Sequence, residues 1–501
     1  NNLMAGYENY YEYIEELGAD RDGYVLTNFP YLNNGPKDLI GNSGKGKEYA
    51  YRSYFGRVMY SYADRYLFQA NIRHDGSSRF AKKHRWGTFP SFSAGWVLSE
   101  ENFMKNLNWD WLSFLKIRAT WGALGNERIG DFPYMSTIAF GNTIFYQNNG
   151  IYFDQTASQQ KYAIENVTWE KTESTDIGLD ISFLNNRLRV NGDYYWKNTK
   201  DMLLAMAIPD FLGFSDPDVN AGKMSTKGYE LNVSWNDHIG DFSYGIAINF
   251  SDFTSKMGDL QGTQFLGDKV KMEGSEFNEW YGYVSDGLFL TEEDLKNSPK
   301  INDKNTQLGD IKYKDISGPD GVPDGKISPE YDRVLLGSSL PHFLYGGNIN
   351  LGYKNFDLSL AFQGVGKQNA RLAREMVEPF RNNYGNFPAI IDGNYWSPYN
   401  TDEQNAVAKY PRLTHVNKSS NYAMSDYWLF NGGYFRLKNI TLGYTFPKEW
   451  MNAIGIKGAR IYASASDLFC LSKYPKGWDP EMGVSEYPIT TSILLGVSVN
   501  F

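Results

Sequence analysis

The last segment of the chain, "TSILLGVSVNF" (residues 491–501), decides the fold because two kinds of side chain alternate along it. From Ile493 to Phe501 the odd-numbered positions are all large and apolar, whereas the even-numbered positions are Leu494, Gly496, Ser498 and Asn500. A β-strand points successive side chains to opposite faces of its sheet, so this segment predicts a strand with one apolar face. That face must be covered either by other protein or by lipid.

The composition is typical of a chain that lies between oil and water. Its 501 residues include 37 Tyr, 31 Phe and 13 Trp, which makes 16% aromatic side chains. The mean hydropathy is nevertheless −0.50, so the chain is polar on average. Tyr and Trp combine an apolar ring with a polar group, and both are enriched at membrane–water boundaries.

Charge and cysteine content exclude several classes of protein. The 49 basic and 58 acidic residues give a net charge of −9 without a basic cluster, which argues against nucleic acid as a partner. Cys470 is the single cysteine, so no intramolecular disulfide and no cysteine-rich metal site can form. No stretch approaches the roughly 20 apolar residues of a membrane helix. The first residues, 1–18, lack the pattern of a signal peptide and already alternate like a strand.

The alternation of the last segment recurs along the whole chain. In "FDLSLAFQ" the apolar residues Phe356, Leu358 and Leu360 share one face, and polar residues separate them. We count about fourteen such segments, each near the roughly ten residues of a membrane-spanning strand. Short turns are expected at Asn185–Asn186 and Lys354–Asn355. Long loops are expected chiefly at 124–172, 252–340 and 364–432, and short helices within loops at 290–298 and 368–380.

These features predict an all-β fold, a transmembrane antiparallel β-barrel whose apolar face contacts lipid. Two short helices cannot cover the apolar faces of a dozen strands, and only closed sheets satisfy every backbone group within a bilayer. Short turns at one end and long loops at the other are typical of outer-membrane barrels. The alternatives are a soluble β-sandwich or propeller and a soluble carbohydrate-binding β protein, although the repeat of roughly 40–50 residues that a propeller needs is not visible.

Several stretches, taken in order, resemble the SusC/RagA family of TonB-dependent outer-membrane transporters. The most specific ones are "NVTWEKTESTDIGLDISFLNNRLRVNGDYYWKNTKDML" (166–203), "GDIKYKDISGPDGVPDGKI" (309–327), "YPRL" (410–413), "YFRLKNITLGYTFP" (434–447) and "ARIYASASDLFCLSKYPKGWDPE" (459–481). The final aromatic residue resembles the signal that the outer-membrane assembly machinery reads. The resemblance spans most of the chain.

The resemblance implies a 22-stranded barrel that is plugged by an N-terminal domain. Residues 1–501 would form the transmembrane barrel portion, with extracellular loop inserts at 252–340, which contains an Asp-rich segment, and at 364–432. The plug and the TonB-contacting segment have no counterpart here, and about fourteen strands would be the C-terminal part of 22. Since a partial barrel has two open edges, we expect either that the chain is a fragment of a longer protein or that a missing piece was cleaved from it.

The resemblance also implies partners. A lipoprotein of the SusD type would form a lid on the outer face, TonB would act through a plug region outside this chain, and lipid and lipopolysaccharide would surround the barrel. The ligand would be an oligosaccharide or an oligopeptide, with a slight preference for a glycan. A dimer of transporter–lid units is compatible with the resemblance.

The segment "KDISGPDGVPDGKISPEYDR" (314–333) is the candidate metal site. Hard cations take several oxygen ligands from alternating loop positions, and a glycine permits the tight turn. The candidate ligands of Ca²⁺ or Mg²⁺ are Asp315, Asp320, Asp324 and Asp332. Val322 stands where a calcium loop needs Asp or Asn, so a turn rich in Asp, Gly and Pro without a metal is the alternative.

No catalytic motif is present, and we expect no enzymatic activity. "GNSGKGKE" (41–48) has the spacing of a phosphate loop, but Glu48 replaces the required Ser or Thr, so we interpret it as a flexible surface loop. The five histidines are scattered without zinc spacing. Trp residues near strand ends, such as Trp96 and Trp121, are predicted to lie at the lipid interface. Loop aromatics such as Trp280, Tyr281, Trp396 and Tyr399 either contact ligand or lid or, as we favour, pack within the loops.

The predicted function is therefore TonB-dependent import of an oligosaccharide or oligopeptide across the outer membrane, with a SusD-like lid. The alternative is a passive pore or a structural barrel without energy coupling. The sequence names no substrate-binding residue, because the side chains of a watery barrel interior are polar in either case.

Overall fold

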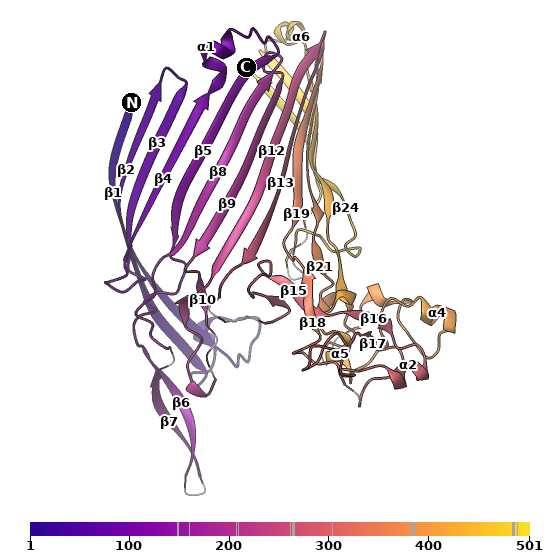
Figure 1. Cartoon of the computed structure of the whole chain (residues 1–501). Helices are drawn as coiled ribbons and strands as arrows, with labels where there is room; N and C mark the ends of the chain where they lie inside the picture. Colours follow the sequence, from indigo (N-terminus) through magenta and orange to yellow (C-terminus); the bar gives the residue numbers. More distant parts are fainter. Residues whose placement is uncertain are drawn as a thin grey trace. The chain divides into compact units, whose positions relative to one another are not determined.

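The computed structural model describes residues 1–147, 150–159, 161–206, 208, 210–260, 262, 266–302, 304–381, 386–482, 486–487 and 489–501. Its main feature is one antiparallel sheet of fourteen strands (Figure 1). In sheet order the strands are β1 (Asn2–Arg21), β2 (Ile40–Tyr62), β3 (Tyr66–Ser77), β4 (Trp86–Val97), β5 (Leu112–Asn126), β8 (Glu170–Phe183), β9 (Leu188–Lys200), β12 (Lys223–Ile239), β13 (Phe242–Met257), β19 (His342–Tyr353), β20 (Phe356–Lys367), β23 (Tyr434–Thr445), β24 (Gly458–Ser472) and β25 (Ser492–Asn500).

The all-β class and the number of strands confirm the prediction from the sequence. The opening residues form β1 and the closing segment forms β25, as their alternation predicts. Several strands are much longer than the expected ten residues: β1 has 20 residues and β2 has 23. About ten residues suffice to cross a bilayer, so strands of this length extend beyond an apolar band.

The remaining strands are short and lie in the loops. They are β6 (Ile138–Gln147), β7 (Gly150–Gln159), β10 (Leu203–Ala205), β11 (Asp218–Asn220), β14 (Lys269–Val270), β15 (Glu279–Tyr283), β16 (Ser285–Leu288), β17 (Ile311–Tyr313), β18 (Arg333–Gly337), β21 (Asn369–Arg371) and β22 (Leu429–Asn431). They pair into five small sheets: β6–β7, β10–β11, β14–β15–β18, β16–β17 and β21–β22.

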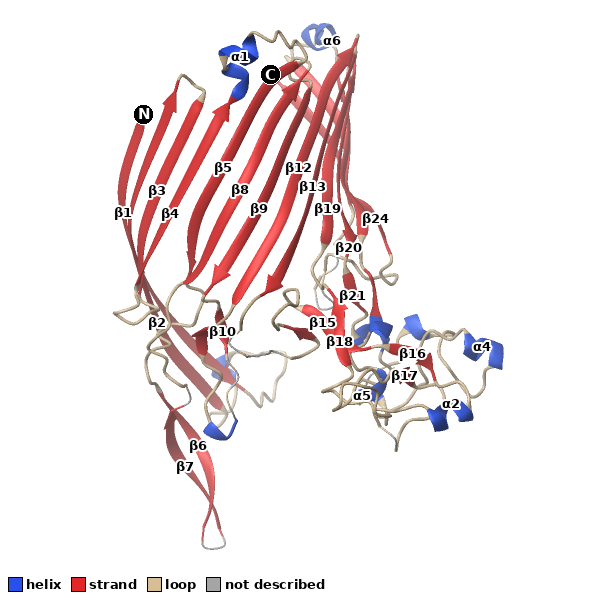
Figure 2. Cartoon of the chain, in the orientation of Figure 1, coloured by secondary structure: helices blue, strands red, loops and turns tan. Residues whose placement is uncertain are grey.

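Helices are few and short, as Figure 2 shows. The α-helices are α1 (Asn102–Lys105), α2 (Glu292–Asn297), α3 (Arg374–Val377), α4 (Asp402–Ala406), α5 (Lys418–Asn421) and α6 (Lys448–Ala453). The 3-10 turns are η1 (Leu32–Asn34), η2 (Leu98–Glu100), η3 (Asp210–Leu212), η4 (Ala389–Ile391) and η5 (Asp426–Trp428). Within the described ranges, none of the helices has the length and apolar character needed to cross a membrane.

The two helices expected from the sequence have different outcomes. The first, α2, is confirmed, and the Thr291 hydroxyl accepts a 3.1 Å hydrogen bond from the backbone N–H of Asp294, as an N-cap residue should. The second, over 368–380, is wrong in its first half. Residues Asn369–Arg371 pair with Leu429–Asn431 as a small sheet, and only Arg374–Val377 are helical. Pairing with a distant segment outweighs the local helix propensity.

Some connections between neighbouring strands are tight turns, and others are long loops. Tight turns join β2 to β3, β8 to β9, β12 to β13 and β19 to β20. The turn residues Asn185, Asn186 and Lys354 have φ of 56°, 64° and 52°, which confirms the predicted turns. The longest loops run between β5 and β8, β13 and β19, and β20 and β23. Alternate connections of an antiparallel sheet lie at the same end, so within the second unit the loops between β13 and β19 and between β20 and β23 share one end. In outer-membrane barrels the long loops are extracellular.

The chain consists of two compact units. The first contains Asn1–Glu100, Arg118–Ile177 and Trp196–Met224, and the second contains Glu101–Ile117, Gly178–Tyr195 and Ser225–Phe501.

The strand register of the second unit gives one apolar face and one polar face. An apolar row formed by directly paired residues runs across β13, β19, β20, β23, β24 and β25, and consists of Ile246, Ile349, Leu360, Ile440, Ala465 and Ile493. Residues between these rows point to the other face, where Ser359 donates a 2.7 Å hydrogen bond to Asn350 and Thr441 bonds Ser464 at 2.8 Å. Cross-strand apolar rows of this kind match a lipid-facing surface.

The first unit shows the same apolar face with aromatic residues at two levels. Tyr62, Tyr66 and Trp96 form one paired row, and the rings of Tyr66 and Trp96 are stacked at 6.4 Å. Tyr7 and Tyr54 form a second aromatic level at 5.2 Å. The strand from Tyr54 to Tyr62 rises about 27 Å before any tilt. This spacing is close to the apolar band of about 25 Å that aromatic girdles flank in outer-membrane barrels.

One loop expected from the sequence is a strand. Residues 41–48 belong to β2, where they pair with β1 from Asp20 to Tyr13. The interpretation as a flexible surface loop is therefore wrong. The polar and glycine-rich sequence has no apolar alternation that would predict a strand. The segment is a strand because its backbone is hydrogen-bonded to that of β1.

The apolar cores are built mainly from loop residues. In the first unit Phe80, Phe89, Ile129, Val167 and Trp169 form a small buried cluster. In the second unit a larger cluster is built from Tyr283, Leu288, Ile311, Tyr313, Ile327, Met376, Val377, Ile391, Tyr422 and Trp428. All members of the larger cluster come from residues 258–341 and 368–433, which we call the loop lobe.

The register predicts opposite sensitivities for neighbouring residues of β20. Leu360 lies midway between the aromatic row of Phe356 and the level of Phe435, so Leu360→Arg should reduce the free energy of unfolding by about 2–4 kcal/mol. Ser359→Arg is the matched control on the opposite face and should cost much less. Denaturant unfolding of the protein in lipid vesicles measures both. Equal losses at the two positions would contradict the assignment of faces.

Candidate functional site

The loop lobe is organised around a buried carboxylate. Asp310 is completely buried, and Arg412 reaches it with Nε and Nη2 at 2.7 and 3.1 Å. Two further donors are amide groups, from Asn417 at 2.8 Å and from Asn421 at 2.9 Å. The backbone N–H of Gln307 adds a fifth hydrogen bond at 2.9 Å. A buried charge with this many partners fixes the loops that supply them.

This centre explains two of the sequence motifs. Asp310 is the second residue of "GDIKYKD", and Arg412 is the third of "YPRL". Gly309 has φ of +83°, and the ring of Trp396 packs where a side chain at this position would stand. The two motifs are therefore halves of one polar centre, although about a hundred residues separate them in the chain.

The buried tyrosine Tyr313 ties the same two segments together. Its hydroxyl donates a 2.6 Å hydrogen bond to the carbonyl of Ser420. Burial raises the pKa of Tyr313, so it stays a neutral donor at physiological pH. Trp428 in turn donates from Nε1 to the carbonyl of Asn421 at 2.9 Å. The lobe thus has a polar framework around its apolar core.

The four candidate metal ligands have different environments. Asp332 is completely buried, and its carboxylate accepts backbone hydrogen bonds from Ile316 at 2.8 Å, Ser317 at 3.3 Å and Ser328 at 2.6 Å. Asp315 accepts one from Gly325 at 2.5 Å, and Asp324 accepts one from Lys326 at 3.0 Å. Asp320 is exposed.

These hydrogen bonds are those of a turn. The part of the chain that the structure describes brings no three His, Cys, Asp or Glu residues together as a group that could hold a metal ion. The alternative of a turn without metal accounts for every contact of Asp315, Asp324 and Asp332 just described. A cation in this loop stays a prediction from the sequence.

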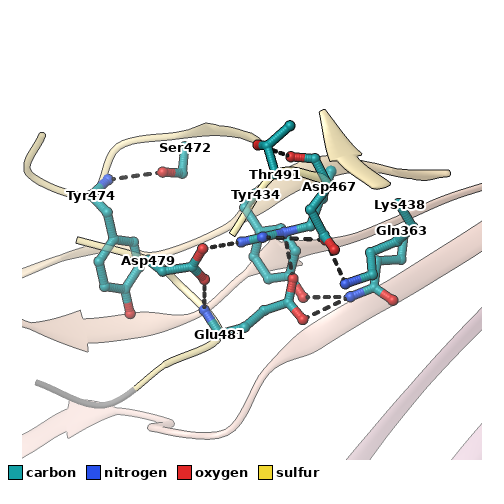
Figure 3. A network of polar contacts seen from close by, with 10 residues as sticks. Gln363, Tyr434, Lys438, Asp467, Ser472, Tyr474, Asp479, Glu481 and Thr491 are labelled. Atoms are coloured by element: carbon teal, nitrogen blue, oxygen red, sulfur yellow. Dashed lines mark hydrogen bonds and ion pairs between the residues drawn. The ribbon is translucent and has the colours of Figure 1, made fainter. Parts of the chain in front are cut away.

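A second charged cluster lies where the loop between β24 and β25 crosses β20, β23 and β24. Arg436 is almost fully buried and contacts Asp467 at 3.5 Å, Asp479 at 2.5 Å and Glu481 at 2.6 Å. Gln363 of β20 also donates to Glu481 at 2.9 Å. Figure 3 shows Asp479 and Glu481 beside Tyr434 and Gln363, and Asp467 beside Lys438. These contacts hold the start of the loop between β24 and β25 against the polar face of the sheet.

A β-bulge makes this cluster. Lys438 is unpaired between Leu437 and Asn439 in both pairings of β23. Opposite β20 it is an extra residue, and opposite β24 it faces two unpaired residues, Asp467 and Leu468. The φ of Asp467 is +50°. The extra residue reverses which positions face outward, so Phe435 and Leu437 join the apolar face on which Ile440 lies. Lys438 and Asp467 then form a 2.7 Å ion pair at the bulge.

In the first unit another motif anchors a loop. Trp169 packs on Phe80 and Phe89 at 5.3 Å each, and its Nε1 donates to the carbonyl of Arg85 at 2.9 Å. Glu170 accepts hydrogen bonds from Asn126 at 3.1 Å and from the N–H of Leu203 at 3.0 Å. The "TWEKT" segment therefore joins three loops at the start of β8.

The loop aromatics differ in role. Trp396 packs against the core of the lobe, and Tyr281 lies under the guanidinium of Arg333 at 4.5 Å, which agrees with the packing interpretation. Tyr399 is 96% exposed. Trp280 lines a pocket and lies under Lys269 at 4.6 Å.

Sequence reasoning missed the charged centres at Asp310 and Arg436. Both residues stand in motifs that the family resemblance rests on, and this was the signal that pointed to them. Their chemistry was invisible in the sequence, because each partner lies far away along the chain.

Removal of the central charge should loosen the loop lobe. Asp310→Asn leaves Arg412 buried without a counter-charge, so we expect the free energy of local opening to fall by about 3–5 kcal/mol. Hydrogen exchange of the lobe amides measures this quantity. Asp286→Asn is the control, because Asp286 is half exposed and pairs with Lys312 at 3.0 Å; it should cost at most about 1 kcal/mol. A loss at Asp310 no greater than that at Asp286 would refute the central role.

The Asp-rich turn gives a separate prediction. Asp332→Ala should speed hydrogen exchange at the amides of Ile316 and Ser328, since they lose their acceptor. Asp320→Ala, at an exposed position, should leave these rates unchanged. The same measurement in the presence of EDTA tests whether a cation is bound. If the turn holds a cation, EDTA should speed exchange as Asp332→Ala does; if the turn holds no metal, EDTA should leave the rates unchanged.

Comparisons with known proteins agree with this structure. The sequence matches the family described as "TonB dependent receptor-like, beta-barrel" over residues 2–468. It is 32% identical over 468 residues to the "TonB-dependent receptor SusC" of Bacteroides thetaiotaomicron, a match that covers 90% of this chain and 43% of that protein. It is 30% identical over 507 residues to the "TonB-dependent receptor P3" of Formosa agariphila, which covers 96% of this chain and 47% of that protein.

A solved structure shows the same fold. The RagAB peptide importer in its closed-closed state superimposes with a TM-score of 0.81 at 22% identity, over 100% of this chain and 53% of that one. The chain thus spans about half the length of the relatives that it matches. On the family match and on its relatives, the chain belongs to the TonB-dependent receptor-like β-barrel family of the outer membrane, with the SusC-like members that its motifs resemble.

Proposed function

We propose that the protein to which this chain belongs imports an oligosaccharide or an oligopeptide across the outer membrane, driven by TonB. The observation that carries the proposal is the continuous match to the TonB-dependent receptor family over residues 2–468. Transport and not catalysis is proposed, since the named relatives are receptors.

The two faces of the large sheet support a role as the wall of a transport path. One face carries apolar rows, and the other carries hydroxyl and amide groups that bond to one another, as at Ser359 with Asn350. A polar surface of this kind is typical of the water-filled interior of outer-membrane barrels. Barrels with many strands also have a lumen wide enough for an oligomer.

The loop lobe supports a role in contact with a lid. Its framework is fixed by the buried Asp310 and Arg412, so the residues on its surface are held in place. Tyr399 and Val407 project from it, with exposed fractions of 96% and 75%. We propose that a SusD-like lipoprotein docks on this side, because the lobe is built from the long loops that face outward in outer-membrane barrels.

The proposal includes two classes of substrate, oligosaccharides and oligopeptides. The RagAB structure is described as that of a peptide importer, and this description applies to that protein. For the present protein the slight preference for a glycan rests on the resemblance to the SusC/RagA family alone. A passive pore without energy coupling is the alternative function.

Loss of TonB should abolish uptake without abolishing binding. In cells that express the protein, deletion of TonB should reduce uptake of a labelled oligosaccharide or oligopeptide to background, while surface binding of the same ligand persists. Uptake of a monosaccharide through ordinary porins serves as the control. Unchanged oligomer uptake in the deletion strain would support the passive pore and overturn the import proposal.

A further inference from the structure

A pocket of about 370 Å³ opens within the second unit at the edge of the loop lobe. Its walls come from β14, β15, β21 and α3, together with Tyr474 from the loop that follows β24. This volume lies in the range of pockets that bind small molecules or the end of a larger one. Of the loop aromatics named from the sequence, Trp280 lines this pocket.

The charged side chains of the pocket are mostly basic. Lys269, Arg371, Arg374 and Arg381 line it, and Glu375 is the one acidic residue among its lining residues. Three of the four basic groups already have acidic partners: Arg371 with Asp268 at 2.5 Å, Arg374 with Glu378 at 2.6 Å, and Arg381 with Glu375. These pairs hold the three guanidinium groups in place.

Lys269 is the remaining cation. Within the described parts of the chain it has no carboxylate partner, and its Nζ lies 4.6 Å from the centre of the Trp280 ring. Burial lowers the pKa of Lys269. An anion beside this ammonium group would favour its charged form, and a cation–π contact leaves the remaining N–H donors of Lys269 available to such an anion.

Arg371 offers a second unused donor. One of its terminal nitrogens is held by Asp268 and the other donates to the carbonyl of Tyr422 at 3.3 Å. Its Nε is buried and finds no hydrogen-bond partner among the residues that the structure describes. A buried N–H without a partner costs free energy, which a ligand oxygen would recover.

Two aromatic rings complete the walls. Trp280 donates from Nε1 to the carbonyl of Asn369 at 2.5 Å, which fixes the indole. Tyr474 packs edge-on against Phe430 with ring centres 4.9 Å apart. Rings held in this way present flat apolar surfaces for the body of a ligand, while Lys269 and Arg371 address its charge.

We propose that this pocket is a binding site for a carboxylate on the transported oligomer. The site would take the uronate group of an acidic oligosaccharide or the free C-terminal carboxylate of an oligopeptide. Lys269 supplies the charge, Arg371 supplies a fixed donor, and Trp280 with Tyr474 supports the adjoining sugar ring or side chain. The inference rests on the proposed import function, because it names the chemical class of the ligand that the transporter takes.

Binding to the purified full-length protein tests the site independently of transport. Isothermal titration should detect trigalacturonate or a tripeptide with a free C-terminus, whereas the methyl-esterified saccharide and the tripeptide amide should bind at least tenfold more weakly. Lys269→Met should weaken binding of the acidic ligand about tenfold to hundredfold. Lys269→Arg should retain most of the affinity. Lys271→Met is the matched control, since Lys271 lies over Phe277 and does not line the pocket.

The outcomes distinguish a glycan carboxylate from a peptide carboxylate, and they distinguish failure of the pocket from failure of the import function. Binding of the uronate alone assigns an acidic glycan, and binding of the free peptide alone assigns a peptide. Equal affinity for acidic and neutral forms, or an unchanged affinity in Lys269→Met with an unchanged melting temperature, overturns the site. Failure of TonB-dependent uptake with intact acidic binding would instead overturn the import function and leave the pocket standing.

Discussion

Every backbone N–H and C=O of a strand within a bilayer needs a partner in the protein, because lipid offers none. The fourteen-stranded ladder of this chain follows from that constraint, and so does the location of its apolar residues. Once the strands pair in register, side chains alternate between lipid and a polar interior. An ordinary core between sheets is therefore unnecessary, and the mean hydropathy can be negative. The buried clusters lie mainly in the loops, where water would otherwise reach them.

In the loops, buried charges add to the apolar packing and connect distant segments. Asp310 with Arg412 and Arg436 with its three carboxylates each connect segments that are distant in the chain. Such centres specify a unique arrangement, since every alternative leaves a charge buried without its partner. Ion pairs of this kind also surround the pocket of Lys269. Neighbouring ion pairs fix three guanidinium groups there and leave one ammonium group for an external anion.

The sequence predicted those features that depend on local order. Alternation predicted the number of strands and the outward face of Leu360, and turn-forming residues predicted the tight turns at Asn185 and Lys354. Sequence reasoning failed where distant pairing decides the structure. Residues 41–48 form a strand because β1 pairs with them, and Asn369–Arg371 form one because Leu429–Asn431 do. The charged centres and the bulge at Lys438 depend on contacts across the fold, which no local pattern contains.

The most direct test of the account is the solvent accessibility of successive residues of β20 in a lipid bilayer. Cys470 is the single cysteine, so its replacement by serine permits spin labels to be placed one at a time from Asp357 to Phe362. A membrane-spanning β20 predicts an alternation: labels at 358, 360 and 362 contact oxygen dissolved in lipid, and labels at 357, 359 and 361 contact a water-soluble relaxation agent. Uniform access of the water-soluble agent to both sets would contradict a membrane-spanning sheet.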